Sequence, residues 1–229
     1  VYRNYFSLLK ITDYETGDPV PYRPNTAQRL LYEAVTRIEA DKRPVRIIIL
    51  KARREGLSTG VQMLFAKRGF TKANTTALTI AHVDDASSEL HGMLEFAYEE
   101  VPGDVKPPKK SSIQGRQLHL ANGSKYRTKT AGARGNAGRA AGYRYIHCSE
   151  VAYWPDAKGT LLAIRQTVSN HAGTMVFLES TANGVGNEFH REWLRAVNGE
   201  TEYEPLFFPW SIFDHYARPF ADAATRSLF

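Results

Sequence analysis

Short runs of apolar, β-branched residues alternate along the chain with segments of helical periodicity. The run Arg-Ile-Ile-Ile-Leu at 46–50 is typical of a strand buried on both faces of a parallel sheet. Further strands are predicted at 75–81, 143–148, 174–178 and 205–209, and helices at 58–70, 85–100, 160–169 and 186–197. Strands that alternate with helices indicate βαβ units, so we expect an α/β fold with a mainly parallel sheet and helices on both faces.

Two further strands are predicted on either side of a tight turn. Segments 117–120 and 124–130 flank Ala-Asn-Gly, and Asn-Gly favours the backbone of a short hairpin. A glycine-rich loop is expected at 131–142. The helix that ends at residue 100 is expected to have Asp84 or Asp85 as its N-cap, because aspartate side chains accept hydrogen bonds from the first free amides of a helix.

Composition places the chain among ordinary globular proteins. Of its 229 residues, 42% are hydrophobic and 24% charged, and no apolar run approaches the ~20 residues that span a bilayer. The single cysteine, Cys148, excludes an internal disulfide. The net charge of +6 favours anionic partners such as nucleic acid or nucleotide, although a solvated basic surface would give the same number.

The basic residues are unevenly distributed. Between positions 105 and 144 the chain carries cations and no acid. These cations are Lys106, Lys109, Lys110, Arg116, Lys125, Arg127, Lys129, Arg134, Arg139 and Arg144. Such a stretch of one sign is typical of a surface that faces phosphates.

The segment 51–59 lies between a predicted strand and a predicted helix, which is the setting of a phosphate-binding loop. Gly56 allows the backbone to approach an anion, and Ser58 falls where a hydroxyl binds Mg²⁺. Leu57 occupies the position of the usual lysine, so the positive charge has to come from elsewhere. The cations within the loop are Lys51, Arg53 and Arg54. An ordinary strand–turn–helix with solvated cations is the alternative.

A carboxylate follows the strand predicted at 143–148. P-loop ATPases carry two acids at the end of the corresponding strand, one that helps to hold Mg²⁺ and one that polarises the attacking water. Here the first position is Ser149, which could hold a metal-bound water, and only Glu150 is acidic. The alternative is an exposed glutamate at a strand end. His147 on the same strand is expected to be a buried histidine whose partners are backbone groups.

A third polar segment, 179–184, follows the strand predicted at 174–178. Its sequence is Glu-Ser-Thr-Ala-Asn-Gly, and its place after the loop and the carboxylate suits a sensor of the γ-phosphate. A β-turn that happens to use Asn-Gly is the alternative.

Together these segments resemble the large terminase subunits of tailed bacteriophages, over roughly 22–208. Gln28 in Pro-Asn-Thr-Ala-Gln resembles the adenine-sensing glutamine motif of that family. Segment 51–59 resembles its deviant Walker A, 146–154 its Walker B, and 179–184 its coupling motif. The order and spacing of the four segments are more specific than any one of them.

The resemblance implies a P-loop NTPase fold of the RecA-like (ASCE) type and a role for each matched residue. Gln28 is expected to recognise adenine, and Glu150 to activate water. The expected ATP-binding residues of the loop are Lys51, Arg53, Arg54, Glu55, Gly56, Leu57, Ser58 and Thr59. The expected metal ligands are Ser58, Ser149 and Glu150, and the expected coupling residues are Ser180, Thr181 and Asn183. The candidates for an arginine finger acting on a neighbouring subunit are Arg134 and Arg139, which could equally contact DNA.

ATP and Mg²⁺ are the cofactors that the resemblance implies. The implied partners are double-stranded DNA, the portal protein, the small terminase subunit and further copies of the chain in a ring, with five expected, on the procapsid. The implied location is the host cytoplasm, with no membrane association and no place in the mature virion. Residues 1–212 are expected to form the packaging ATPase and 213–229 a linker toward a nuclease domain, since Asp214 and Asp222 make no metal cluster.

Two other classes of protein share part of this pattern. Superfamily 2 helicases have the same glutamine, loop and acidic strand end, but they usually need a second RecA-like domain. A nucleic-acid-binding domain that has lost its catalytic site would explain the missing Walker lysine and aspartate.

Overall fold

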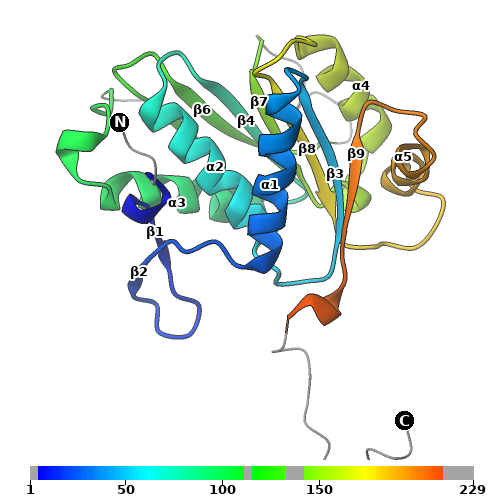
Figure 1. Ribbon diagram of the computed structural model, residues 1–229, viewed down its shortest axis with the longest axis horizontal. Helices are drawn as coiled ribbons and strands as arrows, with labels where there is room; N and C mark the ends of the chain where they lie inside the picture. Colours follow the sequence, from blue (N-terminus) through cyan, green and yellow to red (C-terminus); the bar gives the residue numbers. More distant parts are fainter. Residues whose placement is uncertain (1–4, 111–114, 133–141, 214–229) are drawn as a thin grey trace, which may run out of the picture.

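The computed structural model describes residues 5–110, 115–132 and 142–213 (Figure 1). Its centre is a seven-stranded sheet of order β5-β6-β4-β7-β8-β3-β9, in which only the β5–β6 pair is antiparallel. The strands are β3 (Val45–Lys51), β4 (Thr76–Ala81), β5 (Gln117–His119), β6 (Lys125–Thr130), β7 (Tyr145–Ser149), β8 (Met175–Ser180) and β9 (Glu204–Phe208).

Helices cover both faces of this sheet. The helices on one face are α1 (Thr26–Ala40), α2 (Leu57–Thr71) and α3 (Asp84–Glu100), and those on the other are α4 (Ala157–Thr167) and α5 (Glu188–Val197) (Figure 1). A separate hairpin of β1 (Lys10–Thr12) and β2 (Pro19–Pro21) packs against α3. The predicted α/β class, with a mainly parallel sheet between helices, is confirmed.

Two hydrophobic cores explain the uninterrupted apolar run of β3. Ile47 and Ile49 point into the core beneath α1 and α2, whereas Ile48 points into the core beneath α4 and α5. Successive side chains of a strand face opposite sides, so a strand covered on both faces has to be apolar at every position.

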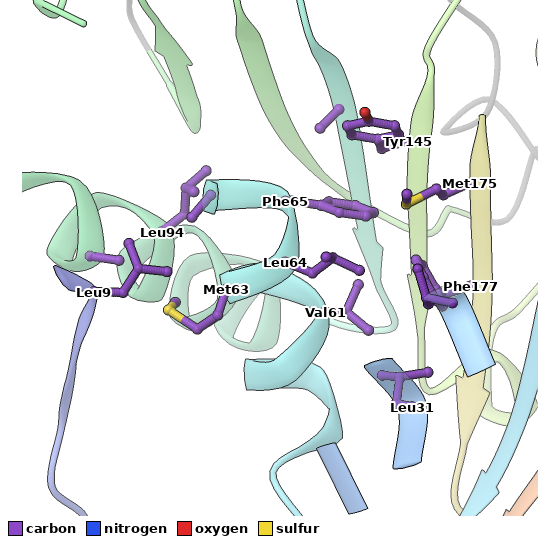
Figure 2. Close-up of a cluster of buried hydrophobic side chains, with 14 of the residues drawn as sticks. Leu9, Leu31, Val61, Met63, Leu64, Phe65, Leu94, Tyr145, Met175 and Phe177 are labelled. Atoms are coloured by element: carbon purple, nitrogen blue, oxygen red, sulfur yellow. The ribbon is translucent and has the colours of Figure 1, made fainter. Parts of the chain in front are cut away.

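α2 is buried along most of its length, because it packs against the sheet, α1 and α3. Figure 2 shows Phe65 directed at Tyr145 of β7 and Phe177 of β8, with ring centroids 5.5 and 6.0 Å apart. Met63 points the other way, toward Leu9 (Figure 2). Burial on several sides fixes the start of α2 firmly against the sheet.

Three features differ from the sequence-based expectations. α1 and the β1–β2 hairpin were not predicted. β8 runs through Glu179 and Ser180, two residues beyond its predicted end. The aspartate cap of α3 was wrong: Val83 is the N-cap, while Asp84 Oδ1 accepts hydrogen bonds from Arg116 at 2.5 Å and from Thr130 at 3.1 Å.

Two other expectations concern residues outside the described ranges. Arg134 and Arg139 lie in the segment 133–141, and all but the first residue of the expected linker lies in 214–229. Among the helices of the described ranges, none is long and apolar enough to cross a membrane.

Candidate nucleotide-binding site

The predicted site residues gather where β3, β7 and β8 end, because the carboxyl ends of parallel strands meet at one edge of the sheet. The loop from β3 to α2 turns sharply there, with left-handed backbone at Arg54 (φ 58°) and Gly56 (φ 71°). Gly56 is the N-cap of α2 and has no side chain to satisfy the first amides of the helix. Those amides are therefore available to an anion.

Two side chains from the start of α1 hold this loop. Asn25 Nδ2 donates to the carbonyl of Glu55 at 3.0 Å, and Gln28 Nε2 donates to the carbonyl of Gly56 at 2.6 Å. Gln28 Oε1 accepts from the Asn25 amide at 3.0 Å, which completes a capping box. A Cβ at Gly56 would lie 2.9 Å from Gln28 Nε2, so only glycine fits this approach. Gln28, 4% exposed, thus supports the loop between β3 and α2.

Glu150 lies at the centre of the site. Its Oε1 accepts from Lys51 Nζ at 2.9 Å, and its Oε2 accepts from the amide and the hydroxyl of Thr181, both at 3.0 Å, and from Ser180 Oγ at 3.3 Å. Asn183 Nδ2 donates to the carbonyl of Ala152 at 3.0 Å. The structure therefore brings together the residues predicted for phosphate contact, for water activation and for coupling.

The backbone of Glu150 is in the left-handed region, with φ 53°. Non-glycine residues adopt this conformation at a cost, and it persists where the surroundings fix it, as at many functional sites. Here the four hydrogen bonds to its carboxylate provide that constraint.

A second carboxylate, Glu179 of β8, was not predicted as a site residue. It is fully buried; Ser58 Oγ donates to its Oε1 at 2.5 Å, and His147 Nε2 lies 3.1 Å from the same oxygen. Burial alone would raise the pKa of the Glu179 carboxyl, but the charge of Lys51, with His147 and Ser58, holds it well below its usual range. His147 is buried as predicted, but side chains rather than backbone surround it.

Lys51 stands among three carboxylates. Burial lowers the pKa of Lys51, but the charges of Glu179, Glu150 and Glu55 outweigh that effect and raise it above its ordinary value. The ammonium group is therefore charged. Burial raises the pKa of Glu55 to about 7, against the smaller opposing influence of Lys51.

The remaining loop residues differ in what they can contact. Arg53 and Arg54 are exposed, and the Arg54 guanidinium lies 5.2 Å from the centroid of the Tyr14 ring. Leu57 is 1% exposed and belongs to the core, so its side chain cannot replace a Walker lysine. Ser149 is 5% exposed at the end of β7.

A cavity of about 560 Å³ lies beside the first turn of α2. It is lined by the hairpin residues Ile11, Thr12, Asp13, Tyr14 and Gly17 together with Thr59, Glu89, Gly92, Met93 and Phe96. A mostly apolar pocket of this size can take a small organic ligand.

The basic stretch after residue 105 divides into two groups in the structure. Lys109 Nζ lies 3.4 Å from Glu95 and Arg116 lies 2.5 Å from Asp84, so α3 neutralises part of it. Lys110, Lys125 and Arg127 are exposed at the β5–β6 edge of the sheet. The uninterrupted run of cations in the sequence therefore overstates the basic surface.

Several solved structures with similar architecture are large terminases of bacteriophages. The large terminase of bacteriophage HK97 matches with a TM-score of 0.69 and 14% identity, over 97% of this chain and 45% of that one. The large terminase ATPase domain of Thermus phage P74-26 matches with a TM-score of 0.62 and 18% identity, over 98% and 95%. The fold is that of a phage large terminase ATPase domain. No protein-family model matches the chain.

A further match is a large terminase from a thermophilic bacteriophage in complex with ADP, with a TM-score of 0.58 and 14% identity. It covers 86% of this chain and 48% of that one. The chain thus spans about half the length of the full-length terminases that it resembles and nearly all of the isolated terminase ATPase domain.

Proposed function

We propose that this chain is the ATPase domain of a phage DNA-packaging motor, which hydrolyses ATP with Mg²⁺ and moves double-stranded DNA into a procapsid. One observation carries the proposal. Glu150 is held between Lys51 from the phosphate loop and Thr181 from the coupling segment. An acid in this position can orient the attacking water, and its contact with Thr181 links it to the segment that follows β8.

In the proposed reaction, a water molecule attacks the γ-phosphorus of ATP, and the bond to the bridging oxygen of ADP breaks. Glu150 orients this water and accepts its proton. Lys51 moves from Glu150 to the phosphates when ATP binds, which frees Glu150 Oε1 for the water. Ser180 and Thr181 remain on Oε2 and report the change to the segment that follows β8.

The residues present fit Mg²⁺, which would neutralise charge on the β- and γ-phosphates. Ser58 offers a hydroxyl at the start of α2, and the buried Oε2 of Glu179 has no hydrogen-bond partner. Within the described ranges no three His, Cys, Asp or Glu residues form a metal centre by themselves. The phosphates of the nucleotide would therefore supply much of the coordination.

The adenine base is proposed to lie in the cavity beside Thr59, next to Tyr14. Gln28 is not among the residues that line this cavity, but it packs beside Gly60, the residue after Thr59, where a Cβ would lie 3.0 Å from Gln28 Cγ. The proposed role of Gln28 in adenine recognition would thus be linked to its support of the phosphate loop.

Contacts to DNA are proposed through exposed cations such as Lys110, Lys125 and Arg127, and they should be independent of sequence and sensitive to salt. The proposed working form is a ring of this chain on the portal of a procapsid in the host cytoplasm, with the small terminase subunit as a further partner. Arg134 or Arg139 would complete the site of a neighbouring subunit.

The experiment that tests this function compares Glu150→Gln with the wild type. Glutamine keeps the size of the side chain and removes the base, so the hydrolysis rate should fall by at least ~10²-fold. The affinity for a slowly hydrolysed ATP analogue with Mg²⁺, measured by calorimetry, should stay within about threefold of the wild-type value.

Glu188→Gln is the matched control. Its carboxylate is 17% exposed and paired with Arg191, much as that of Glu150 is 20% exposed and paired with Lys51, but it lies on α5. This variant should hydrolyse ATP at the wild-type rate. Loss of nucleotide binding in Glu150→Gln would make Glu150 a structural residue, and a wild type that binds no nucleotide would favour a nucleic-acid-binding domain without a catalytic site.

A further inference from the structure

The strand that carries Glu150 lacks the second acid that usually helps to hold the metal ion, since Ser149 occupies that position. In the sheet, Ser149 of β7 is the register partner of Glu179 of β8. Both continue the series of residues that face α2, because His147 and Phe177, two positions earlier, pack against Phe65. Neighbouring strands lie about 4.8 Å apart, so a carboxylate on β8 can reach the space beside Ser149.

Glu179 is already engaged with the expected metal-binding hydroxyl. Ser58 Oγ donates its proton to Glu179 Oε1 at 2.5 Å. A hydroxyl has one proton and two lone pairs, so this hydrogen bond leaves the lone pairs of Ser58 free for a cation. The other oxygen, Glu179 Oε2, is buried and has no hydrogen-bond partner. An unsatisfied carboxylate oxygen in a dry site is costly unless a ligand completes it.

Side chains from three elements hold Glu179 in place. Gln62 Nε2 lies 2.9 Å from both Thr79 Oγ1 and His147 Nδ1. When the amide donates to both, His147 Nδ1 accepts and the ring proton is on Nε2, which lies 3.1 Å from Glu179 Oε1 without hydrogen-bond geometry. Such supporting contacts orient the ligands of metal sites.

We propose that Glu179, together with Ser58, holds the Mg²⁺ of the bound nucleotide. Glu179 supplies the acid that is missing at the position of Ser149. In this chain the acid is on the adjacent strand β8 and not at the end of β7. A glutamate side chain is one methylene longer than aspartate, which spans the distance from β8. This inference rests on the proposed nucleotide site, and it gives a role to a buried acid that follows four apolar residues of β8.

The test measures binding of Mn²⁺, as a paramagnetic substitute for Mg²⁺, in the presence of ADP by electron paramagnetic resonance. Glu179→Gln removes one charge at nearly constant volume. It should weaken Mn²⁺ binding at least ~10-fold, the range found when metal-site residues are replaced. Binding of ADP without metal should change less than about threefold. Ser149→Asp in the Glu179→Gln background should restore Mn²⁺ affinity, because it returns an acid to β7.

Glu192→Gln is the matched control, since Glu192 is 3% exposed and ion-paired with Arg165 on the opposite face of the sheet. It should bind Mn²⁺ as the wild type does. If thermal melting shows that Glu179→Gln is unfolded, Glu179→Asp replaces it: the charge stays but the carboxylate is shorter, and Mn²⁺ binding should again weaken.

Wild-type affinity for Mn²⁺ in the folded Glu179 variant would overturn the inference. That result is distinct from failure of the proposed function. If the proposed function fails, the wild type itself will bind neither ADP nor Mn²⁺, and it will show no ATP hydrolysis for Glu150→Gln to abolish.

Discussion

Lys51, at the start of the loop between β3 and α2, stands among three carboxylates. The charge of its ammonium group interacts with those of Glu179 and Glu150. It also interacts with Glu55, which lies in the loop itself. Glu55 is 1% exposed and neither of its oxygens has a hydrogen-bond partner. A neutral Glu55 suits this position, because a further negative charge would repel the phosphates that the loop is proposed to bind.

The titration of Glu55 gives a prediction for stability. The folded protein keeps this carboxyl protonated up to about pH 7, whereas the unfolded chain ionises it near pH 4.5. The protein should therefore be most stable below pH 4.5 with respect to this group, and should lose up to ~3 kcal/mol as the pH rises through 7. Glu55→Gln should be more stable than the wild type at pH 8 and close to it at pH 5, by urea unfolding.

Glu33→Gln, on the exposed face of α1, controls for the removal of one negative charge. An equal stability difference between Glu55→Gln and the wild type at both pH values would show that Glu55 is ionised in the folded protein.

The site residues that could be predicted from the sequence are those with a fixed place in a sequence motif. Lys51 is the last residue of β3, Glu150 and Thr181 directly follow β7 and β8, and the structure brings the three together. Glu179 was missed because its role depends on the register between β7 and β8, which residue spacing alone does not reveal. Two features of the sequence could have indicated Glu179: it is an acid next to an apolar strand, and Ser149 replaces the usual aspartate. Whether Ser149 itself approaches the metal stays a prediction.

At the scale of elements, α2 connects the site to the core. The packing of α2 against the sheet depends on Gly69. The Tyr126 hydroxyl of β6 donates to the carbonyl of Phe65 at 3.0 Å, and passes so close to Gly69 that a Cβ there would lie 1.8 Å from it. Tyr126 is 2% exposed, so neighbouring core side chains enclose its ring.

Gly69→Ala should therefore destabilise the protein by about 1 to 3 kcal/mol, as overpacked core substitutions do. Urea unfolding measures this change. Gly92→Ala in α3 is the control, because nothing lies within 4 Å of a Cβ there. It should stabilise the helix by up to ~1 kcal/mol, since alanine is the better helix former. Destabilisation of similar size in both variants would contradict the role given to Gly69.

β3, α2, α3 and the β5–β6 hairpin were predicted to within one residue at each end, because apolar runs, helical segments and an Asn-Gly turn mark them in the sequence. α1 was missed because the residues that cap it, Asn25 and Gln28, were interpreted as a ligand-recognition motif. The last two residues of β8 were expected in a turn, since buried acids seldom occur in strands. Lys51, His147 and Ser58 provide the charge and hydrogen bond that make Glu179 tolerable there.

At the scale of the whole molecule, the order of strands decides which residues meet. β8 lies between β3 and β7, so the coupling segment that follows it touches both the loop after β3 and the acid after β7. That order could not be read from the sequence, although the four motifs that it unites could. The cation paired with Glu150 is Lys51, and the proposed mechanism takes an arginine from a neighbouring copy of the chain.

The most direct test of the account is the rate of ATP hydrolysis with Mg²⁺ at increasing protein concentration, with Glu150→Gln as the blank. A catalytic site completed by a neighbour should give a rate that depends on Glu150 and rises more steeply than linearly with protein concentration. An arginine supplied in this way can be worth ~10³–10⁵ in rate. Absence of hydrolysis and of nucleotide binding at every concentration would contradict the central claim that the loop between β3 and α2 serves an ATPase.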